Sequence, residues 1–422
     1  MFRDTLVPKH RRCIVEQSLS KQMARIKHRA VDIITEEELE AKVKRAIETG
    51  KPLRVKLGLD PNRPDIHIGH MVVIDKLRDF QDLGHEVVLI VGTFTGFIGD
   101  PSARDSTRPQ ISLEQVMQHA GTYFEQVQEV LDPNKTQIVS NADWLMPLNF
   151  ADILGIASKV TVAQFLERDD FQMRYREGRP ISLQEFLYPL AQAYDSVAVQ
   201  SDVELGGTDQ KFNCLVGRDL QRAFGQEAQC VLTTPLLVGT DGEKKMSKSL
   251  DNYIGITEEP DMMYGKIMSI PDLAMPDYFT LCTNEPPEWI ADAQKAIQHG
   301  AINPMEFKKK LARTIVARYH SKIAADEAEA NFVKVFSKHE LPDEMPEFHV
   351  PDKIKEADGR VWIVKLITTS GLAPSNSEAK RLIAQGGVTI DGKIIDDFEA
   401  KVELRDGQVL KVGKRRFVRV KV

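Results

Sequence analysis

One stretch of this chain, residues 53–91, restricts the fold more than any other. Residues 53–59 alternate between apolar and polar side chains like a half-buried strand, and a loop rich in proline and charge follows. An apolar-periodic helix then begins near His67 and stops at Gly84, and a continuous apolar strand covers residues 87–91. A strand, a helix and a strand within about forty residues form a βαβ unit, which requires a parallel sheet with a right-handed crossover. The sequence therefore predicts an α/β fold with a parallel sheet.

Two short motifs carry groups that suit phosphate chemistry. The first, His67-Ile68-Gly69-His70, puts two imidazoles on one face of the first turn of the predicted helix. Free backbone N–H groups and the helix dipole favour an anion there. The second, Lys245-Met246-Ser247-Lys248-Ser249, follows an apolar run broken by glycines, so it predicts a cationic loop able to close over a polyphosphate. Solvated histidines or a solvated lysine loop would explain either motif alone, but the pair indicates a polyphosphate site.

Several classes of protein are disfavoured by what the sequence lacks. The glycine-rich stretch 92–101 does not match the dinucleotide-binding fingerprint, and there is no P-loop lysine motif. No apolar run approaches the ~20 residues that span a bilayer. Four scattered cysteines, without a Cys-x-x-Cys, indicate free thiols in a reducing compartment rather than a zinc site or a disulfide framework. We therefore expect a cytoplasmic protein with no structural metal and no membrane contact.

The chain is long enough for several domains. Its 422 residues are too many for one ordinary core, so two to three domains are expected. Helical patterns occupy 112–195, strand and helix alternate again over 202–240, and a proline-rich acidic stretch has the composition of a linker. The predicted order is a leader, a parallel-sheet domain with a helical insertion, an α-helical domain, a linker and a small α+β domain. Their ranges are 1–34, 35–260, 261–336, 337–359 and 360–422.

Charge is divided unevenly along the chain. The net charge is −6, but residues 361–422 carry twelve Lys/Arg and seven Asp/Glu, a balance of +5 that leaves −11 for the remainder. This small domain is predicted to contain two helices and a hairpin with an Asp391-Gly392 turn. We favour an RNA-binding surface over a merely solvated basic face. The candidate RNA contacts are Lys380, Arg381, Lys414, Arg415 and Arg416.

The two phosphate motifs resemble the signature pair of class I aminoacyl-tRNA synthetases, and the basic C-terminal domain resembles the S-four RNA-binding module. Further segments stand in the order found in bacterial tyrosyl-tRNA synthetases, namely Lys56–Pro61, Gly96–Pro101, Tyr188–Asp195 and Gly206–Gln210. The similarity runs through nearly the whole chain from about residue 35. The resemblance implies a Rossmann-like catalytic domain that activates L-tyrosine with ATP and Mg²⁺ and charges tRNA(Tyr). It also implies a cytoplasmic homodimer with no membrane or DNA partner.

The resemblance also implies roles for the residues that match the family's motifs. Catalysis at the phosphates is assigned to His67, His70, Lys245, Lys248, Arg104 and Arg108. Contacts to ATP are assigned to Gly69, Asp60, Asp209 and Lys248. Contacts to tyrosine are assigned to Tyr188, Gln192, Asp195, Asp100 and Gln210, with Asp195 as the acceptor of the phenol hydroxyl. Tyr188, Gln192 and Asp195 are spaced i, i+4 and i+7, so they can share one helix face and one pocket.

One position departs from the family pattern. The best-known tyrosyl enzymes have a tyrosine two residues before the glycine of the Gly58–Pro61 segment, where it shares the phenol hydroxyl, but this chain has Lys56. Either another group contacts the hydroxyl or Asp195 does so alone.

Three alternatives fit the sequence less well. A tryptophanyl-tRNA synthetase would not usually carry the S-four tail or place Asp195 in its side-chain pocket. A nucleotidyltransferase that makes a small-molecule adenylate would lack the basic RNA module. A non-catalytic RNA-binding synthetase paralogue would have no need to keep both phosphate motifs.

Overall fold

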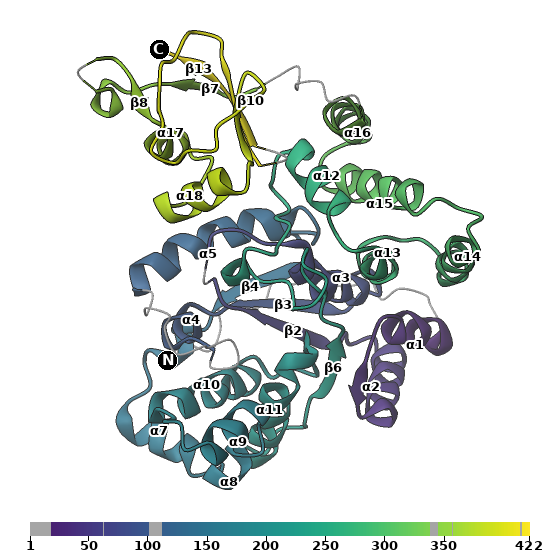
Figure 1. The fold of residues 1–422 in the computed structure, drawn as a ribbon. Helices are drawn as coiled ribbons and strands as arrows, with labels where there is room; N and C mark the ends of the chain where they lie inside the picture. The colour runs from purple at the N-terminus through teal and green to yellow at the C-terminus, as the bar shows by residue number, and fades with distance from the viewer. Residues whose placement is uncertain (1–17, 62, 101–111, 338–344, 357, 414–415) are drawn as a thin grey trace. The chain divides into compact units, whose positions relative to one another are not determined.

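The computed structural model describes residues 18–61, 63–100, 112–337, 345–356, 358–413 and 416–422 (Figure 1). The chain divides into two compact units, Met1–Glu258 with Ser269–Leu311, and Glu259–Met268 with Ala312–Val422. A β-sheet forms the framework of each unit. None of the helices in the described residues is both long and apolar enough to cross a membrane.

The first unit contains a six-stranded sheet in the order β1-β6-β5-β2-β3-β4. All neighbouring strands are parallel except β1 and β6, which pair antiparallel. The predicted parallel α/β fold is therefore confirmed. The strands are β1 Asp32–Ile34, β2 Arg54–Leu59, β3 Glu86–Val91, β4 Thr136–Ser140, β5 Val203–Gly207 and β6 Cys230–Thr234.

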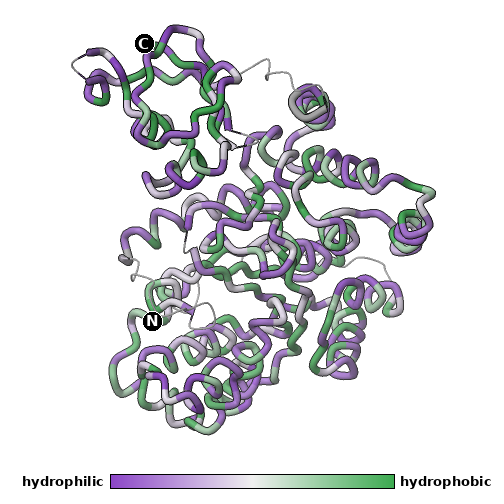
Figure 2. Tube along the Cα trace, viewed as in Figure 1, coloured by the Kyte–Doolittle hydropathy of each residue, from purple (hydrophilic) through white to green (hydrophobic). Residues whose placement is uncertain are grey.

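The centre of this sheet is covered on both faces. The residues from Val87 to Val91 in β3 are all buried, as expected for a parallel strand between two layers of helices, and Figure 2 shows the central strands mainly as hydrophobic. Figure 1 shows α3 (Ile68–Asp82) on one side of the sheet and α10 (Leu183–Val199) with α11 (Lys211–Ala223) on the other. The chain runs outward from β2 to β4, and then returns to the other side of β2 as β5. The topological switch point therefore lies between β2 and β5.

Several other helices of the first unit lie in segments predicted to be helical, whereas the helices within residues 19–49 and 93–98 were not predicted. They include the insertion between β4 and β5, which is helical as expected. Their bounds are α1 Leu19–Lys27, α2 Glu36–Thr49, α4 Thr93–Ile98, α5 Leu113–Gln128, α6 Ala142–Leu145, α7 Phe150–Ala157, α8 Val162–Phe165, α9 Asp169–Arg176, α13 Met275–Cys282 and α14 Pro287–Gln298. Three short 3₁₀ turns are η2 Thr208–Gln210, η3 Lys248–Leu250 and η4 Asp272–Ala274.

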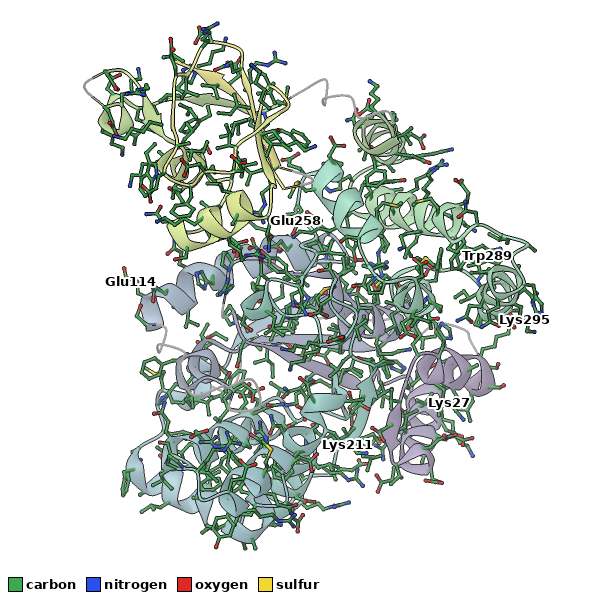
Figure 3. The ribbon with its side chains drawn as sticks, viewed as in Figure 1. Lys27, Glu114, Lys211, Glu258, Trp289 and Lys295 are labelled. Atoms are coloured by element: carbon green, nitrogen blue, oxygen red, sulfur yellow. The ribbon has the colours of Figure 1, made fainter. Side chains whose placement is uncertain are left out.

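The predicted leader, residues 1–34, differs from the structure in its second half. There α1 and β1 form, and β1 extends the sheet beside β6. Arg25 of α1 donates to Asp79 of α3 at 2.8 Å, and Lys211, labelled in Figure 3, donates to Asp32 of β1 at 2.7 Å. These ion pairs and the strand pairing make residues 18–34 part of the first unit.

The second unit contains a five-stranded sheet in the order β10-β9-β12-β13-β7 and a two-stranded sheet of β11 with β8. The predicted hairpin is present, since Asp391 and Gly392 have φ of 48° and 78° and join the antiparallel strands β9 and β10. The strands are β7 Glu347–His349, β8 Val361–Trp362, β9 Val388–Ile390, β10 Lys393–Ile394, β11 Lys401–Val402, β12 Val409–Val412 and β13 Arg416–Lys421. The helices that lie wholly within it are α12 Pro260–Met268, α16 Lys322–Ser337, α17 Ile363–Thr369 and α18 Asn376–Ala384.

Two predicted boundaries do not coincide with these units. The segment 261–336 is helical as expected, but its helices belong partly to each unit, and α15 (Pro304–Tyr319) spans the division. The predicted linker 337–359 contains β7, which pairs parallel with β13. Part of that linker is therefore a strand of the C-terminal sheet.

Candidate active site

A cavity of about 520 Å³ opens at the carboxyl ends of β2 and β5, the switch point of the sheet. Segments far apart in the sequence contribute its lining, including the ends of strands, the first turn of α3, one face of α10 and the lysine-rich motif. Twelve of the residues assigned to chemistry from the sequence line it: Asp60, His67, Gly69, His70, Asp100, Tyr188, Gln192, Asp195, Asp209, Gln210, Lys245 and Lys248. Arg104 and Arg108 lie outside the described residues.

The two histidines form a stacked pair at the beginning of α3. His67 is the N-cap residue, and its ring centroid lies 3.7 Å from that of His70. Burial lowers the pKa of His67 to about 3. Burial also lowers the pKa of His70 well below its usual value, and the neighbouring imidazole of His67 adds to this effect. Gly69 makes room for this arrangement, since a Cβ there would lie 3.0 Å from Nδ1 of His67. Both imidazoles are therefore neutral at physiological pH and can each donate one N–H.

The lysine-rich motif points both of its assigned lysines into the cavity. Nζ of Lys245 lies 2.8 Å from Oδ2 of Asp209. Nζ of Lys248 donates to the hydroxyl of Tyr123 at 3.1 Å and to the carbonyl oxygen of Arg63 at 3.2 Å. Burial lowers the pKa of Lys248 to about 8. The motif therefore supplies cations beside the histidine pair.

The tyrosine-assigned face is the face of α10 that carries Tyr188, Gln192 and Asp195, and its Tyr188 end contacts Asp60. The hydroxyl of Tyr188 donates to Oδ2 of Asp60 at 2.8 Å, and the hydroxyl of Thr95 donates to Oδ1 at 2.7 Å. Burial raises the pKa of Asp60 to about 7, against the effect of these two bonds. Because the Tyr188 hydroxyl donates to Asp60, its oxygen is oriented to accept a hydrogen bond from a ligand.

Asp100 is held by two groups from different elements. Nε2 of Gln210 donates to Oδ2 of Asp100 at 2.9 Å, and the buried guanidinium of Arg168 donates to Oδ1 at 3.3 Å. The side chain of Asn213 in turn donates to Oε1 of Gln210 at 2.9 Å. This network fixes a carboxylate at the edge of the cavity.

Asp195 sits in a buried polar corner at the other end of the same helix face. Nε1 of Trp144 donates to Oδ1 at 2.8 Å, and Nδ2 of Asn141 donates to Oδ2 at 3.3 Å. Burial raises the pKa of Asp195 to about 7, and the positive charge of Lys56 is the strongest opposing influence. Each carboxylate oxygen keeps capacity to accept one further bond, which suits a hydroxyl donor.

Several residues around the cavity were missed by reasoning from the sequence. They support the assigned residues through tertiary contacts, and no motif or periodicity marks them. They are Tyr123, Asn141, Trp144, Arg168 and Glu204. Among the described residues, no group of three or more His, Cys, Asp or Glu side chains is placed to hold a metal ion.

Comparison with known proteins identifies the family. Residues 48–337 match the family model described as tRNA synthetases class I (W and Y), and residues 361–407 match the S4 domain. The chain is 51% identical over 406 residues to the tyrosine–tRNA ligase of Moorella thermoacetica, covering 96% of this chain and 97% of that protein. It is 52% identical over 400 residues to the tyrosine–tRNA ligase of Thermotoga maritima, covering 95% and 97%. The chain belongs to the bacterial tyrosine–tRNA ligases.

Solved structures of tyrosyl-tRNA synthetases share the fold. The enzyme from Archaeoglobus fulgidus, solved with L-tyrosine, has a TM-score of 0.59 at 21% identity and covers 74% of this chain and 99% of its own. The enzyme from Aeropyrum pernix has a TM-score of 0.58 at 18% identity, with coverage of 76% and 99%. These structures and the family match confirm the predicted class I synthetase fold, and the S4 match confirms the predicted S-four tail. The identity to curated tyrosine–tRNA ligases confirms the tyrosyl prediction over the tryptophanyl alternative.

In this tyrosine–tRNA ligase, three of the cations assigned to RNA can be located. Arg381 pairs with Glu378 at 2.6 Å, and Lys380 lies over the rings of Phe398 and Trp362 at 4.9 and 5.6 Å. The Arg416 guanidinium donates to a backbone carbonyl at 2.7 Å. The other two, Lys414 and Arg415, lie outside the described residues.

Proposed function

We propose that the cavity of this tyrosine–tRNA ligase activates L-tyrosine with ATP and then transfers the tyrosyl group to the 3′ end of tRNA(Tyr), with the residue roles given below. The observation that carries the proposal is that one cavity joins the two phosphate motifs to the polar face of α10. Groups that bind polyphosphate and groups that bind an amino acid are thereby within reach of a single substrate complex.

In the first step, an oxygen of the tyrosine carboxylate attacks the α-phosphorus of ATP. The bond from that phosphorus to the bridging oxygen breaks, and pyrophosphate leaves. Negative charge grows on the departing phosphates, so cations placed there stabilise the transition state. Lys245 and Lys248 are assigned to this role, and neutral His67 and His70 donate N–H groups to the phosphates or ribose. Arg104 and Arg108 are assigned further contacts from the sequence alone, and Mg²⁺ enters with ATP, held by its phosphates.

ATP is otherwise positioned by groups around the first turn of α3. We assign Gly69 to the close approach of the nucleotide, Asp209 to the ribose and Asp60 to a further ATP contact, and their shared position in the cavity lining supports these roles. Asp209 already holds Lys245 at 2.8 Å, so nucleotide binding and the lysine motif share one carboxylate.

Tyrosine is recognised at both of its polar ends. Tyr188, Gln192 and Asp100 bind the α-ammonium group, and Gln210 lies near the carboxylate. Asp195 accepts the phenol hydroxyl, because its two oxygens are aligned by Trp144 and Asn141. Phenylalanine has no hydroxyl and would leave this buried carboxylate without a hydrogen-bond donor. An unsatisfied buried acceptor costs more free energy than a solvent-exposed hydrogen bond contributes.

In the second step, a hydroxyl of the 3′-terminal ribose of tRNA attacks the carbonyl of tyrosyl-adenylate, and AMP leaves. The S-four domain contributes tRNA affinity through Lys380, Arg381 and Arg416 and, from the sequence, Lys414 and Arg415. The net charge is positive on this domain and negative on the rest of the chain, which supports a role of the S-four domain in binding the tRNA phosphates.

The protein is proposed to act in the cytoplasm as a homodimer. Support comes from the helical insertion, where large apolar side chains remain exposed although polar residues would be expected on a free surface. These are Met146, Phe150, Leu154, Val162, Met173, Tyr175 and Leu183. A second copy of the chain would cover such a surface.

ATP–pyrophosphate exchange, run separately with each of the twenty amino acids, tests the proposal. Exchange is expected with tyrosine and at most weakly with phenylalanine. Exchange that depends on tryptophan instead, or no exchange with any amino acid, would refute the proposed function.

A further inference from the structure

A buried ion pair lies beside the tyrosine-assigned face without lining the cavity. Lys56 of β2 and Glu204 of β5 are cross-strand neighbours, and Nζ of Lys56 lies 3.0 Å from Oε1 of Glu204. The two side chains are only 1% and 2% exposed, and neither belongs to the described lining of the cavity. Burying two charges costs desolvation energy, so such a pair is weak evidence for added stability. Its neighbours indicate another role.

Glu204 determines how Gln192 is oriented. Nε2 of Gln192 lies 3.3 Å from Oε1 of Glu204. A carboxylate only accepts hydrogen bonds, so the amide nitrogen of Gln192 must face it, and the carbonyl oxygen is left for a donor in the cavity. Ser196 and Gln229 donate to the other oxygen of Glu204 and hold the carboxylate in place. The α-ammonium group of an amino acid is a donor that this carbonyl oxygen would accept.

Lys56 acts on the opposite end of the same face. Glu204, which holds Nζ of Lys56 at 3.0 Å, also accepts a hydrogen bond at 3.3 Å from Ser196, the residue that follows Asp195 on α10. The positive charge of Lys56 opposes the effect of burial on the pKa of Asp195. An ionised Asp195 can only accept, whereas a protonated one would offer a hydrogen of its own to the phenol oxygen. The buried ammonium group therefore favours the form of Asp195 that accepts a hydroxyl donor.

We propose that Lys56 and Glu204 form a positioning pair for tyrosine, in which Glu204 aims the carbonyl of Gln192 at the α-ammonium group and Lys56 keeps Asp195 an acceptor for the phenol hydroxyl. The inference rests on the proposed activation of tyrosine and deepens it. It also explains how a lysine can stand where the best-known relatives have a tyrosine. The lysine serves the hydroxyl site through Asp195 and does not touch the substrate.

The test uses the full-length double variant Lys56→Met/Glu204→Gln. Both replacements keep the side-chain length approximately, and removing both charges avoids leaving one buried and unpaired. The KM for tyrosine is expected to rise by about tenfold, and the preference for tyrosine over phenylalanine in kcat/KM to fall by about tenfold, since each end loses one oriented hydrogen bond. The KM for ATP should not change. Inhibition by 3-(4-hydroxyphenyl)propionate, which lacks the amino group, should be affected less than tyrosine binding.

Two further variants separate positioning from stability. Lys76→Met removes a comparable buried lysine, 2% exposed and paired with Asp79 at 2.9 Å on α3, and should lower the melting temperature without changing the preference for tyrosine. Lys56→Arg retains the charge and should keep most of the preference for tyrosine over phenylalanine. Asp195→Asn removes the carboxylate itself and gives the largest loss of preference with which the other variants are compared.

The outcomes are distinct. A folded double variant with wild-type KM for tyrosine and wild-type preference would overturn the inference. If the double variant does not fold, Lys56→Arg decides, because a folded form of it that has lost the preference would contradict a role based on charge. A wild-type protein without tyrosine-dependent exchange would instead refute the proposed function itself.

Discussion

The hydroxyl of Tyr188 and Oδ2 of Asp60 are joined by a hydrogen bond of 2.8 Å that ties the middle of α10 to the end of β2. Thr95 donates to the other oxygen of Asp60, and Asn141 donates both to Thr95 at 3.0 Å and to Asp195 at 3.3 Å. One chain of hydrogen bonds thus links the two ends of the amino-acid site. Such a network resists separate movement of its parts.

Replacing Tyr188 by phenylalanine should therefore weaken tyrosine binding. The change removes an acceptor for the α-ammonium group and the bond that orients it, and we expect a loss of about tenfold to a hundredfold in affinity. Equilibrium dialysis with labelled tyrosine measures it. Tyr175→Phe, at an exposed tyrosine on α9, is the matched control and should bind like wild type. Equal affinity of Tyr188→Phe and wild type would contradict the assigned role.

Lys248→Ala should slow formation of tyrosyl-adenylate while leaving tyrosine affinity nearly unchanged. A cation that meets the polyphosphate acts mainly in the transition state, so a rate loss of about a hundredfold or more is expected. Single-turnover pyrophosphate release provides the rate. Lys244→Ala, at an exposed neighbour in the same loop, should retain most of the rate. The assignment is wrong if tyrosine affinity collapses and the rate does not.

Asp195→Asn should change how stability depends on pH. Because burial raises the pKa of Asp195 from 3.8 to about 7, the folded protein binds more protons than the unfolded chain between these values. Wild type therefore loses stability as pH rises through this window, and asparagine does not. The stability of the variant relative to wild type should be greater at pH 8 than at pH 5. The difference should be on the order of 3 kcal/mol, because only the two pH units from 5 to 7 contribute, at about 1.4 kcal/mol each.

Thermal unfolding of wild type and variant at both pH values checks this prediction without ligands. Other groups that titrate do so in both proteins, so the difference isolates residue 195. Asp143→Asn, at an exposed aspartate on α6, should show the same gap from wild type at pH 5 and pH 8. A pH-independent gap for Asp195→Asn would count against a raised pKa.

Neutralising Lys380 and Arg381 together with glutamine should reduce tRNA charging but not pyrophosphate exchange. If these cations contact phosphates, tRNA affinity should fall by about tenfold at low salt. The slope of log affinity against log salt concentration should also become less steep, by about one for each lost phosphate contact. Lys353 and Arg405, exposed cations of the same unit, serve as the control pair. Unchanged tRNA affinity at low salt would exclude the tested pair from the RNA contacts.

Phe150→Glu should convert a dimer to monomers. The side chain is 75% exposed on α7, and a charge at a packed interface would be left without a partner. Sedimentation velocity measures the shift in mass. Leu273→Glu, at a 94% exposed leucine outside the insertion, should remain dimeric. A wild-type protein that sediments as a monomer at micromolar concentration would refute the homodimer.

The parts of the molecule that the sequence predicted well are those with strong local signals. The β2–α3–β3 unit follows from apolar periodicity, and the spacing of Tyr188, Gln192 and Asp195 is sufficient to place all three on one wall of the cavity. By contrast, Trp144 and Asn141 reach Asp195 from the short segment after β4, and this contact depends on how that segment packs across the sheet.

Short elements were also beyond local reasoning. β7 is three residues long and lies among prolines and acidic residues, so its composition suggested a linker, and only pairing with β13 makes it a strand. Glu204 lies within a short, otherwise apolar segment, where nothing local shows that its partner is Lys56 on the neighbouring strand. Both features depend on contacts between residues distant in sequence.

The antiparallel strand β1 has a consequence for solubility. Without it, β6 would present a row of unpaired N–H and C=O groups on a strand whose residues Val231 and Leu232 are fully buried, and such an edge can recruit other extended chains into aggregates. β1 occupies that edge for only three residues and carries a charged aspartate, Asp32, so it offers little template of its own. The short strand β1, which precedes every catalytic motif in the chain, thus protects the edge of the catalytic sheet from pairing with other protein molecules.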